Sequence, residues 1–268
     1  MKFSTVLSAA LLGASTTLAA PRPAANRIGK RSIQKKSLPK MSAVGAHNTT
    51  ADEEESYNWS GAVLVGTGYT SVTGKIVVPT ISSGSSNNDK VGTAWVGIDG
   101  DTCSSLWQTG VSWTVEDGSV DYTAWYEWVP YSASVDFTGI TISAGDSIVM
   151  TVTATSTTSG TATIENETTG KTVSHTYSSM SSDNALCYYN AEWIVEDFAE
   201  CLDSSCTQTE LLPFADYGSV EFTDCSAVKS GATVDVTGAT TIDMVSQSDD
   251  SVESSCTDTA STVTCKYV

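Results

Sequence analysis

The chain has 268 residues, of which 31 are acidic and 13 are lysine or arginine, so its formal net charge at pH 7 is −18. This excess of negative charge argues against nucleic acid or an anionic membrane as a partner, because phosphate groups would be repelled. It favours a protein that works in acid, where protonation relieves the mutual repulsion of the carboxylates.

Residues 1–20 have the pattern of a secretory signal peptide. They carry one lysine, the short apolar run VLSAALLGA and the small-residue end TLAA. This run is too short to span a membrane, and no later stretch is apolar enough to do so. The sequence therefore predicts a secreted, extracellular protein without a membrane anchor.

Residues 21–56 read as a basic propeptide in front of an acidic domain. Residues 21–51 contain 7 basic and no acidic side chains, whereas residues 57–268 contain 27 acidic side chains against 5 lysines. Blocks of like charge are often disordered tails. We favour a propeptide that binds electrostatically to its own domain near neutral pH and is released when the carboxylates protonate. The dibasic pairs in GKRS and QKKS are candidate processing sites.

Seven cysteines lie in the acidic part, at positions 103, 187, 201, 206, 225, 256 and 265. In a secreted protein most of them should form disulfides, and the short spacings 201 to 206 and 256 to 265 favour two local bridges. One cysteine is left over. The only histidine after the propeptide is His175, so the sequence predicts no metal site. Sequons at Asn58 and Asn166 predict surface glycosylation, and a third, at Asn48, would leave with the propeptide.

The remaining part, residues 57–268, is predicted to be a single all-β domain, and we expect it to be a monomer. Alternating apolar and polar residues recur in short segments separated by Gly, Ser, Asn and Asp: GAVLVG, GKIVVP, TAWVGID, DYTAWYEWV, GITIS, SIVMTVTATS, TATIENETT, KTVSHTYS and SVEFTDCS. Many short strands joined by turns indicate an antiparallel β-sandwich or barrel.

Glu192, in YNAEWIVEDF, is the most informative residue of these strands. In an extended segment it shares a face with Ile194, while Trp193 points to the other side. A carboxylate among apolar neighbours is poorly solvated, and its own segment offers no basic residue to neutralise it. Such a residue is a candidate for catalysis.

Three other segments place polar groups among tryptophans. Trp95 and Asp99 share a face in TAWVGIDGD, Gln108 lies in SSLWQTG, and Trp125 shares a face with Glu127 in TAWYEWVP. Tryptophans in strands usually belong to a core, and a buried glutamate is often a satisfied hydrogen-bond partner. Together, however, these segments could line one sheet surface rich in tryptophan and acid.

The ordered strings YNWSGAVLVG, GTAWVGIDGDTC, LWQTG, YTAWYEWVP, GITISAGDSI, NAEWIVEDF and VEFTDCS resemble those of the fungal glutamic peptidases, the eqolisins. The similarity runs from about residue 57 to residue 268. It implies a lectin-like β-sandwich of two large antiparallel sheets, with an active-site cleft on the concave face. It also implies an acid endopeptidase that cleaves polypeptides without a metal or cofactor and is insensitive to pepstatin.

By motif, the resemblance places the catalytic dyad on Gln108 and Glu192. Glu192 would act as general base and then general acid, and Gln108 would orient the water and stabilise the oxyanion. An amide supplies a donor and an acceptor and never titrates, so Gln108 would play the part of a permanently protonated acid.

The resemblance also assigns substrate-binding roles to Trp95, Asp99, Trp125 and Glu127. It further implies a disulfide between Cys103 and Cys187, which leaves Cys225 free. Ser112 and Thr123 stand where family members carry acids, so the acidity of the cleft should differ in this chain.

Two other functions fit the residues. A glycoside hydrolase could use Glu127 and Glu192 as a carboxylate pair in a tryptophan-lined cleft. A lectin-like binding module could use the tryptophans as stacking surfaces. Gln108 distinguishes them, because only the peptidase requires it.

Overall fold

The computed structural model describes residues 34–43, 52–82 and 89–268. The predicted signal peptide, the GKRS pair and Asn48 lie outside the described residues. The described part is almost entirely strand, with one short 3-10 helix at Ser182–Asn184. Among these residues, no helix has the length and apolar character that a membrane span requires.

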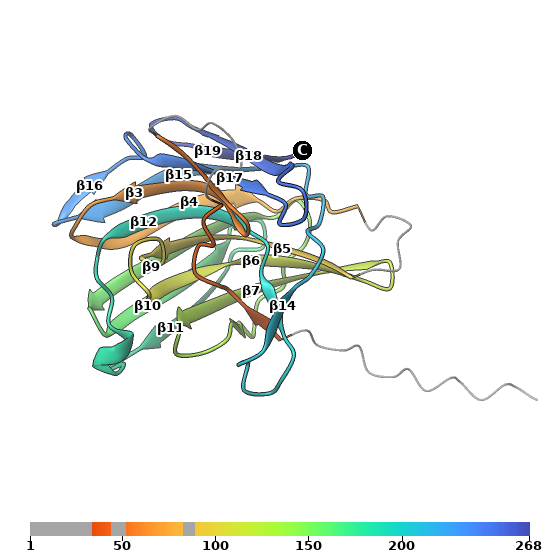
Figure 1. Ribbon diagram of the computed structural model, residues 1–268. Helices are drawn as coiled ribbons and strands as arrows, with labels where there is room; N and C mark the ends of the chain where they lie inside the picture. The colour runs from red at the N-terminus through yellow and green to blue at the C-terminus, as the bar shows by residue number, and fades with distance from the viewer. Residues whose placement is uncertain (1–33, 44–51, 83–88) are drawn as a thin grey trace, which may run out of the picture. The chain divides into compact units, whose positions relative to one another are not determined.

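Two antiparallel layers form the molecule (Figure 1). The first layer has the strand order β19-β18-β17-β3-β12-β5-β6-β7-β8, with β2 added in parallel beside β17. Its strands are β2 (Glu53–Ser56), β3 (Trp59–Val65), β5 (Lys90–Ile98), β6 (Leu106–Glu116), β7 (Ser119–Val129), β8 (Val135–Asp136), β12 (Asn190–Glu196), β17 (Thr240–Val245), β18 (Val252–Asp258) and β19 (Val263–Tyr267).

The second layer has the order β11-β10-β9-β4-β15, with β16 paired to β15. Its strands are β4 (Tyr69–Val77), β9 (Ser147–Ser156), β10 (Ser159–Asn166), β11 (Lys171–Tyr177), β15 (Ser219–Lys229) and β16 (Ala232–Val234). Strand β15 joins the layers, because its first half pairs with β19 and its second half with β4. The predicted β-sandwich is confirmed.

Alternation of side chains divides the apolar residues of the first layer between two clusters. Alternate positions such as Val96, Trp107, Trp128 and Trp193 face the second layer and form the main core with it. The intervening positions lie on the opposite surface, the outer face, where a smaller buried cluster collects Trp59, Val63, Trp95, Leu106, Trp125, Val129, Ile194 and Ile242. A second buried cluster on one side of a sheet requires something to cover it.

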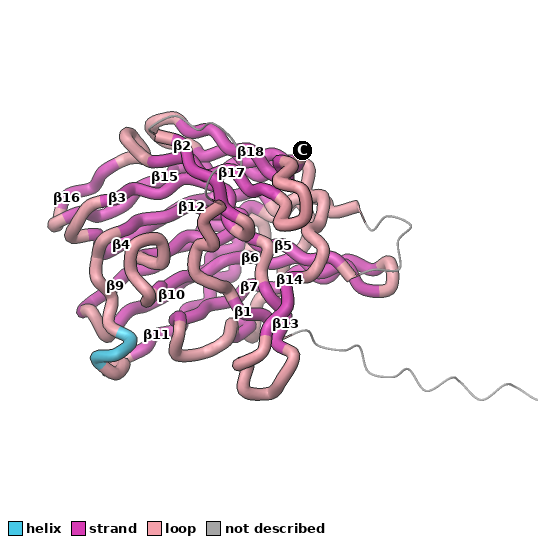
Figure 2. Tube along the Cα trace, viewed as in Figure 1, coloured by secondary structure: helices cyan, strands magenta, loops and turns pink. Residues whose placement is uncertain are grey.

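The cover comes from the predicted propeptide. A small third sheet holds β1 (Lys35–Lys36), β13 (Ala199–Cys201) and β14 (Thr209–Leu211), and residues 37–43 continue from β1 (Figure 2). We call residues 34–43 the pro-segment. Its described residues are paired and hydrogen-bonded to the domain, so the alternative of a disordered tail is wrong for this part of the chain.

One predicted strand is absent. Residues 139–143, GITIS, form no strand, because their backbone groups bond to side chains in place of a neighbouring strand. The Ser143 N–H donates to Asp146 Oδ2 at 2.8 Å, and Asn166 Nδ2 donates to the Thr141 carbonyl at 3.2 Å. Ile142 is buried in the main core from this irregular segment.

The predicted disulfides are present. Cys103 is bonded to Cys187, the two short spacings are bridged, and Cys225 is free and buried. The glycosylation sites differ from expectation. Asn58 and Asn166 are both fully buried, and each side-chain amide donates hydrogen bonds to neighbouring groups. Neither asparagine is therefore at the surface in this conformation.

Candidate active site

Four residues form a row across the outer face of the first layer. Glu192 of β12 lies opposite Gly97 of β5, Gly97 opposite Gln108 of β6, and Gln108 opposite Glu127 of β7. Residues directly opposite in antiparallel strands point to the same face, so Glu192, Gln108 and Glu127 project from one surface. The predicted catalytic pair thus lies in one row, with a single residue between its members.

Gly97 separates the two members of the predicted dyad. Two strand spacings place their Cα atoms roughly 9.5 Å apart, and the intervening residue has no side chain. A Cβ added at Gly97 would lie 2.7 Å from the Trp95 ring and 2.9 Å from Leu106 Cδ1. The Trp95 indole and the Leu106 side chain therefore leave no room for a side chain at this position, which only glycine can occupy without a clash.

The polar atoms at this gap lack partners. Gln108 Oε1 and both carboxylate oxygens of Glu192 are buried, and within the described part of the chain none of them has a hydrogen bond. Gln108 Nε2 donates to Glu127 Oε2 at 3.3 Å. Buried polar atoms are nearly always hydrogen-bonded in folded proteins, so unpaired atoms on both sides of Gly97 are candidates to bind water or substrate.

Burial also dominates the electrostatics of Glu192. It raises the pKa of this carboxyl well above its ordinary value, and the nearby charges of Asp101 and Asp99 raise the pKa further. The charge of Lys40 in the pro-segment lowers it, as does the Asp101 backbone N–H, which lies near Glu192 without making a hydrogen bond to either oxygen. The basic residue missing from the segment around Glu192 is supplied by the pro-segment.

Trp95 and Trp125 occupy the next row. Trp95 lies opposite Gly110, and Gly110 lies opposite Trp125, so the two indoles flank a second glycine. Trp95 Nε1 donates to Glu196 Oε2 at 2.7 Å, and Trp125 Nε1 donates to Thr93 Oγ1 at 3.0 Å. Both tryptophans belong to the outer-face cluster and are separate from the main core.

Asp99 does not follow the alternation predicted for it. Strand β5 ends at Ile98, and Asp99 has a left-handed backbone with φ of 69°. Its carboxylate therefore turns toward residues 187–190, whose four successive backbone N–H groups donate to it at 2.6 to 3.2 Å. Asp99 acts as a clamp on the segment that leads into β12.

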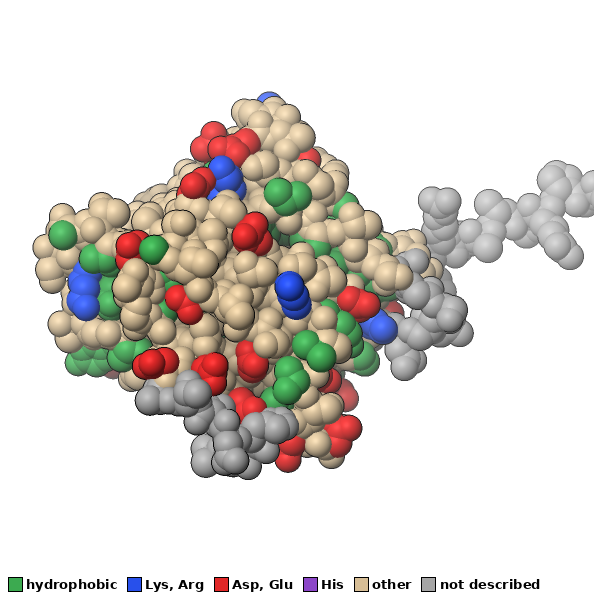
Figure 3. Space-filling view, turned by 90° about the horizontal axis from the view of Figure 1, so that it is seen from above, with side chains coloured by type: hydrophobic (Ala, Val, Ile, Leu, Met, Phe, Trp, Pro, Cys, Tyr) green, Lys and Arg blue, Asp and Glu red, His purple; other side chains and the backbone are tan. Residues whose placement is uncertain are grey.

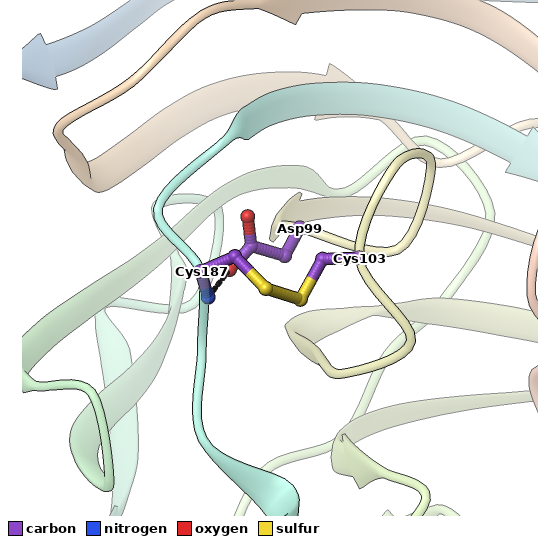
Figure 4. Close-up of side chains that lie close together, drawn as sticks. All are labelled: Asp99, Cys103 and Cys187. Carbon is purple, nitrogen blue, oxygen red and sulfur yellow. Dashed lines mark hydrogen bonds between the residues drawn. A yellow bond between two sulfur atoms is a disulfide. The ribbon is translucent and has the colours of Figure 1, made fainter.

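Figure 4 shows this clamp beside the disulfide between Cys103 and Cys187. The sulfur atoms and the Asp99 carboxylate lie within 4.8 Å of one another. This geometry would suit a metal ion if the cysteines were thiolates, but their sulfur atoms are joined to each other. The cluster is instead a structural lock between the ends of β5 and β12.

Glu196 is a site residue that the sequence reasoning missed. It is fully buried on the outer face and accepts bonds from Trp95 Nε1, the Ser37 hydroxyl and the Leu38 N–H. Burial raises the pKa of Glu196 to about 8, although these donors lower it. The alternation that singled out Glu192 also places Glu196 on the same face, four residues later in β12.

Glu127 is buried at the far end of the row. Burial raises the pKa of Glu127 well above its ordinary value, and the nearby charge of Glu196 adds to the rise. The Ser37 N–H, which donates to Glu127 Oε2 at 3.1 Å, works against it. Glu127 and Glu192 stand three strand spacings apart, roughly 14 Å between Cα atoms, with Gly97 and Gln108 between them in the row.

The pro-segment covers this surface. Lys35 Nζ donates to the hydroxyls of Ser112 and Thr123 and forms an ion pair with Asp136 at 2.9 Å. Lys40 forms ion pairs with Glu54 and Asp101. Acidic side chains are spread over the face of the molecule seen in Figure 3, with few basic ones between them. Two of the basic residues of the pro-segment are thus neutralised in the cleft region.

The comparisons with known proteins agree with this geometry. A model of the Peptidase A4 family matches residues 57–267. Aspergillopepsin-2 of Aspergillus niger is 45% identical to the chain over 294 residues, and scytalidopepsin B of Scytalidium lignicola is 46% identical over 274 residues. Each match covers 100% of both proteins.

Solved structures give the same result. Scytalido-glutamic peptidase with a transition state analog inhibitor has a TM-score of 0.71 and 47% identity, over 79% of this chain and 98% of that one. Aspergilloglutamic peptidase from Aspergillus niger has a TM-score of 0.59 and 48% identity, over 67% and 99%. The chain therefore belongs to the Peptidase A4 family and is a glutamic peptidase, as its motifs predicted.

Proposed function

We propose that this protein is a secreted acid endopeptidase that hydrolyses polypeptides with Gln108 and Glu192. The observation that carries the proposal is that Gln108 and Glu192, each with buried polar atoms that lack a partner, stand on either side of Gly97 in one row on one face of the sheet. Peptide complexes of relatives support the substrate class. Scytalido-glutamic peptidase binds a peptide-based transition state analog, and SCP-B binds the tripeptide Ala-Ile-His.

In the proposed mechanism a water molecule lies between the two side chains. The Glu192 carboxylate takes a proton from this water as it attacks the scissile carbonyl carbon. Gln108 Nε2 donates to the developing oxyanion, and its Oε1 accepts from the water. Glu192 then passes the proton to the leaving amine, so the acid ends ionised and ready for another cycle. The mechanism uses no metal or cofactor.

The pro-segment is proposed to keep the enzyme inactive in two ways. It occupies the surface that a substrate would need, where the Ser37 and Leu38 N–H groups donate to Glu127 and Glu196, and Glu192 on the same face is fully buried in the precursor. Burial holds the pKa of Glu192 high, which keeps the base protonated. Release of the segment would hydrate the carboxylate and lower its pKa, so uncovering the cleft and generating the base are the same event.

Acid is the proposed trigger for release. Lys35 forms an ion pair with Asp136 and Lys40 with Asp101, both in the domain, while the second partner of Lys40, Glu54, belongs to the predicted propeptide itself. At lower pH the domain as a whole carries less negative charge, so it attracts the two lysine charges of the pro-segment less strongly. The precursor would therefore release its pro-segment at the acidic pH at which the peptidase works.

The dyad is tested by replacing each member in the full chain. We expect Gln108→Ala and Glu192→Gln to reduce turnover in acid by at least about a hundredfold, because each removes a group that acts in the transition state. Digestion of a denatured protein from pH 2 to 7, with sequencing of the fragments, measures this. Neither pepstatin nor a chelator should inhibit the wild type.

Matched controls are available on the exposed surface. Gln208→Ala and Glu165→Gln change the same residue types far from the row, and both should cleave normally. A folded Gln108→Ala or Glu192→Gln variant that retains near-normal cleavage would refute the assignment of the dyad.

A further inference from the structure

The main chain of the pro-segment is bound by a set of side chains to which no role has been assigned. The Leu38 N–H donates to Glu196 Oε1 at 3.1 Å, and the Leu38 carbonyl accepts from Trp59 Nε1 at 3.1 Å and from Asn58 Nδ2 at 3.3 Å. Asn58 Nδ2 also reaches the Pro39 carbonyl at 3.3 Å, and Asn58 Oδ1 accepts from the Met41 N–H at 2.8 Å. Backbone groups from residue 38 to residue 41 are therefore recognised.

The receiving side chains are held by residues outside the pro-segment. Asn58, Trp59 and Glu196 are all fully buried. Asn58 Oδ1 accepts from the Ser56 hydroxyl at 3.0 Å, the Trp59 ring lies edge-on against Trp95 at 5.0 Å, and Glu196 accepts from Trp95 Nε1. A preformed site of this kind has little side-chain entropy to lose when a chain binds.

These contacts ignore side-chain identity, because they are made to backbone N–H and carbonyl groups. Any peptide that takes up the backbone conformation of residues 38–41 presents the same groups, whatever its side chains. Pro39 lies between the residues whose N–H groups are bound, so its missing N–H costs none of these contacts. A site that hydrogen-bonds only to backbone groups can bind peptide substrates of many different sequences.

The site lies on the surface that carries the dyad. Glu196 follows Glu192 by four residues on β12, which places their Cα atoms roughly 13 Å apart along the strand. Glu196 lies opposite Trp59 of β3, and Asn58 directly precedes that strand. A polypeptide bound at Asn58 and Glu196 could therefore run a few residues further and reach Gln108 and Glu192.

We infer that Asn58, Trp59 and Glu196 form a main-chain binding site for polypeptide substrates, and that the pro-segment occupies this site in the precursor. The inference rests on the proposed function, since it concerns the substrate of the same cleft. Asn58 acts as a two-sided clamp that donates to two carbonyl groups and accepts from one N–H. Glu196 supplies the acceptor for the N–H at the other end.

The test uses the full chain after acid activation, a peptide substrate, and a synthetic peptide of residues 34–43 as inhibitor. We expect Asn58→Ala and Glu196→Leu each to raise KM and the inhibition constant of the peptide by about tenfold or more, since each leaves peptide groups without partners. The value of kcat should stay within about threefold, because these contacts are equal in ground and transition states.

Glu196→Gln is the matched variant, because glutamine keeps the shape and one acceptor of the protonated acid. Its NH2 group faces one of the N–H donors from which the two carboxylate oxygens accept, so its loss of affinity should lie between that of the wild type and that of Glu196→Leu. Asn58→Asp keeps the acceptor for the Met41 N–H but replaces the donor with an oxygen that faces two carbonyl groups, so it too should raise KM and the inhibition constant, and it serves if Asn58→Ala fails to fold. Asn184→Ala, at a site where the amide donates to Ser181, controls for loss of an asparagine.

An inhibitor peptide methylated at the Leu38 nitrogen isolates one contact. Methylation should weaken inhibition of the wild type and have no further effect on Glu196→Leu, because the partner is already absent. If the variants weaken the peptide inhibitor but leave KM unchanged, the site serves the pro-segment alone and the inference is overturned. It is also overturned if kcat falls while KM and peptide affinity stay constant. Failure of the proposed function would be seen separately, as an active Gln108→Ala variant.

Discussion

At the scale of single residues, the proposed chemistry depends on the missing side chain of Gly97 as much as on the dyad. Gly97 lies between Gln108 and Glu192 in the row, and a methyl group there would be forced against the side chains of Trp95 and Leu106. We expect Gly97→Ala to cost about 1 to 3 kcal/mol of stability through overpacking. It should also lower kcat by tenfold or more, since the added methyl group narrows the space for water. Denaturant unfolding and peptide hydrolysis measure the two effects.

Gly92 provides the control on the same strand. Its side faces the main core, where an added Cβ would meet the Trp113 ring at 2.4 Å. Gly92→Ala should therefore destabilise the fold by a similar mechanism and leave the kcat of the folded enzyme unchanged. Equal losses of kcat in both variants would show that the effect of Gly97→Ala is general and not local to the dyad.

The alternation of side chains predicted most of the site, because it depends only on strands being extended. Gln108, Glu192, Trp95, Trp125 and Glu127 all lie on the face that this rule gave them. The rule failed for Asp99, whose left-handed backbone ends the strand.

The main-chain contacts of Asn58 could not be predicted from the sequence. They depend on a pro-segment that returns from 20 residues earlier in the chain, and no local pattern encodes such a contact.

At the scale of elements, the position of β12 relative to β5 is set by a small clamp. The Asp99 carboxylate accepts four N–H groups from residues 187–190, and burial raises its pKa while these four bonds lower it. Asp99→Asn replaces one acceptor oxygen with an NH2 group that faces the N–H donors. We expect a loss of about 2 to 4 kcal/mol, since two buried donors lose their partner. Catalysis should weaken too, because Glu192 follows this segment directly.

Asp117→Asn is a suitable comparison for this effect. Asp117 has a similar left-handed backbone, with φ of 50°, but lies exposed in the turn between β6 and β7. Asparagine tolerates this conformation, so the change should be nearly neutral there. Unfolding curves for both variants, together with KM and kcat, separate loss of the clamp from any effect of the backbone conformation. A stable and fully active Asp99→Asn enzyme would contradict the clamp.

Strands were predicted correctly where apolar and polar residues alternate along the segment. The prediction failed where side chains, in place of a neighbouring strand, bind the backbone N–H and carbonyl groups. The segment 147–156 reads as a strand and is one, because its apolar positions alternate against the core. The segment 139–143 also alternates apolar and polar residues, but Asp146 and Asn166 bind its backbone groups. Only a prediction of those two side-chain positions could have distinguished the cases.

At the scale of the whole molecule, charge links the pro-segment to the acidity of the medium. Lys40 is largely buried between Glu54 and Asp101. Lys40→Gln removes both ion pairs, so we expect the full chain to become active at a higher pH than the wild type. The measurement is the pH at which activity first appears as the precursor is acidified. Lys171→Gln, on the exposed strand β11, should leave that pH unchanged, and an equal shift in both variants would indicate an effect of net charge alone.

The buried carboxylates predict how stability changes with pH. Burial raises the pKa of Glu127, Glu192 and Asp197 well above their ordinary values, and that of Glu196 from 4.5 to about 8. A group whose pKa is higher in the folded state binds its proton more tightly there. Its contribution to stability is complete at a pH below its pKa in the unfolded state. That contribution is lost as the pH rises through its pKa in the folded state. The denaturant concentration at the unfolding midpoint should therefore decrease as the pH rises from 5 to 8. Each such group contributes up to about 1.4 kcal/mol per pH unit to this loss of stability.

The inactive Gln108→Ala background prevents self-digestion during this measurement. The window avoids strong acid, where Asp203 and Asp249, whose pKa values are lowered by hydrogen bonds, act in the opposite direction. Glu196→Gln cannot titrate and resembles the protonated acid, so it should flatten the dependence between pH 5 and pH 8, whereas Glu165→Gln on the surface should not. A midpoint that rises from pH 5 to pH 8 would mean that these carboxylates fold in their ionised form. The pro-segment would then hold the cleft through charge alone, and release of the segment would no longer generate the catalytic base.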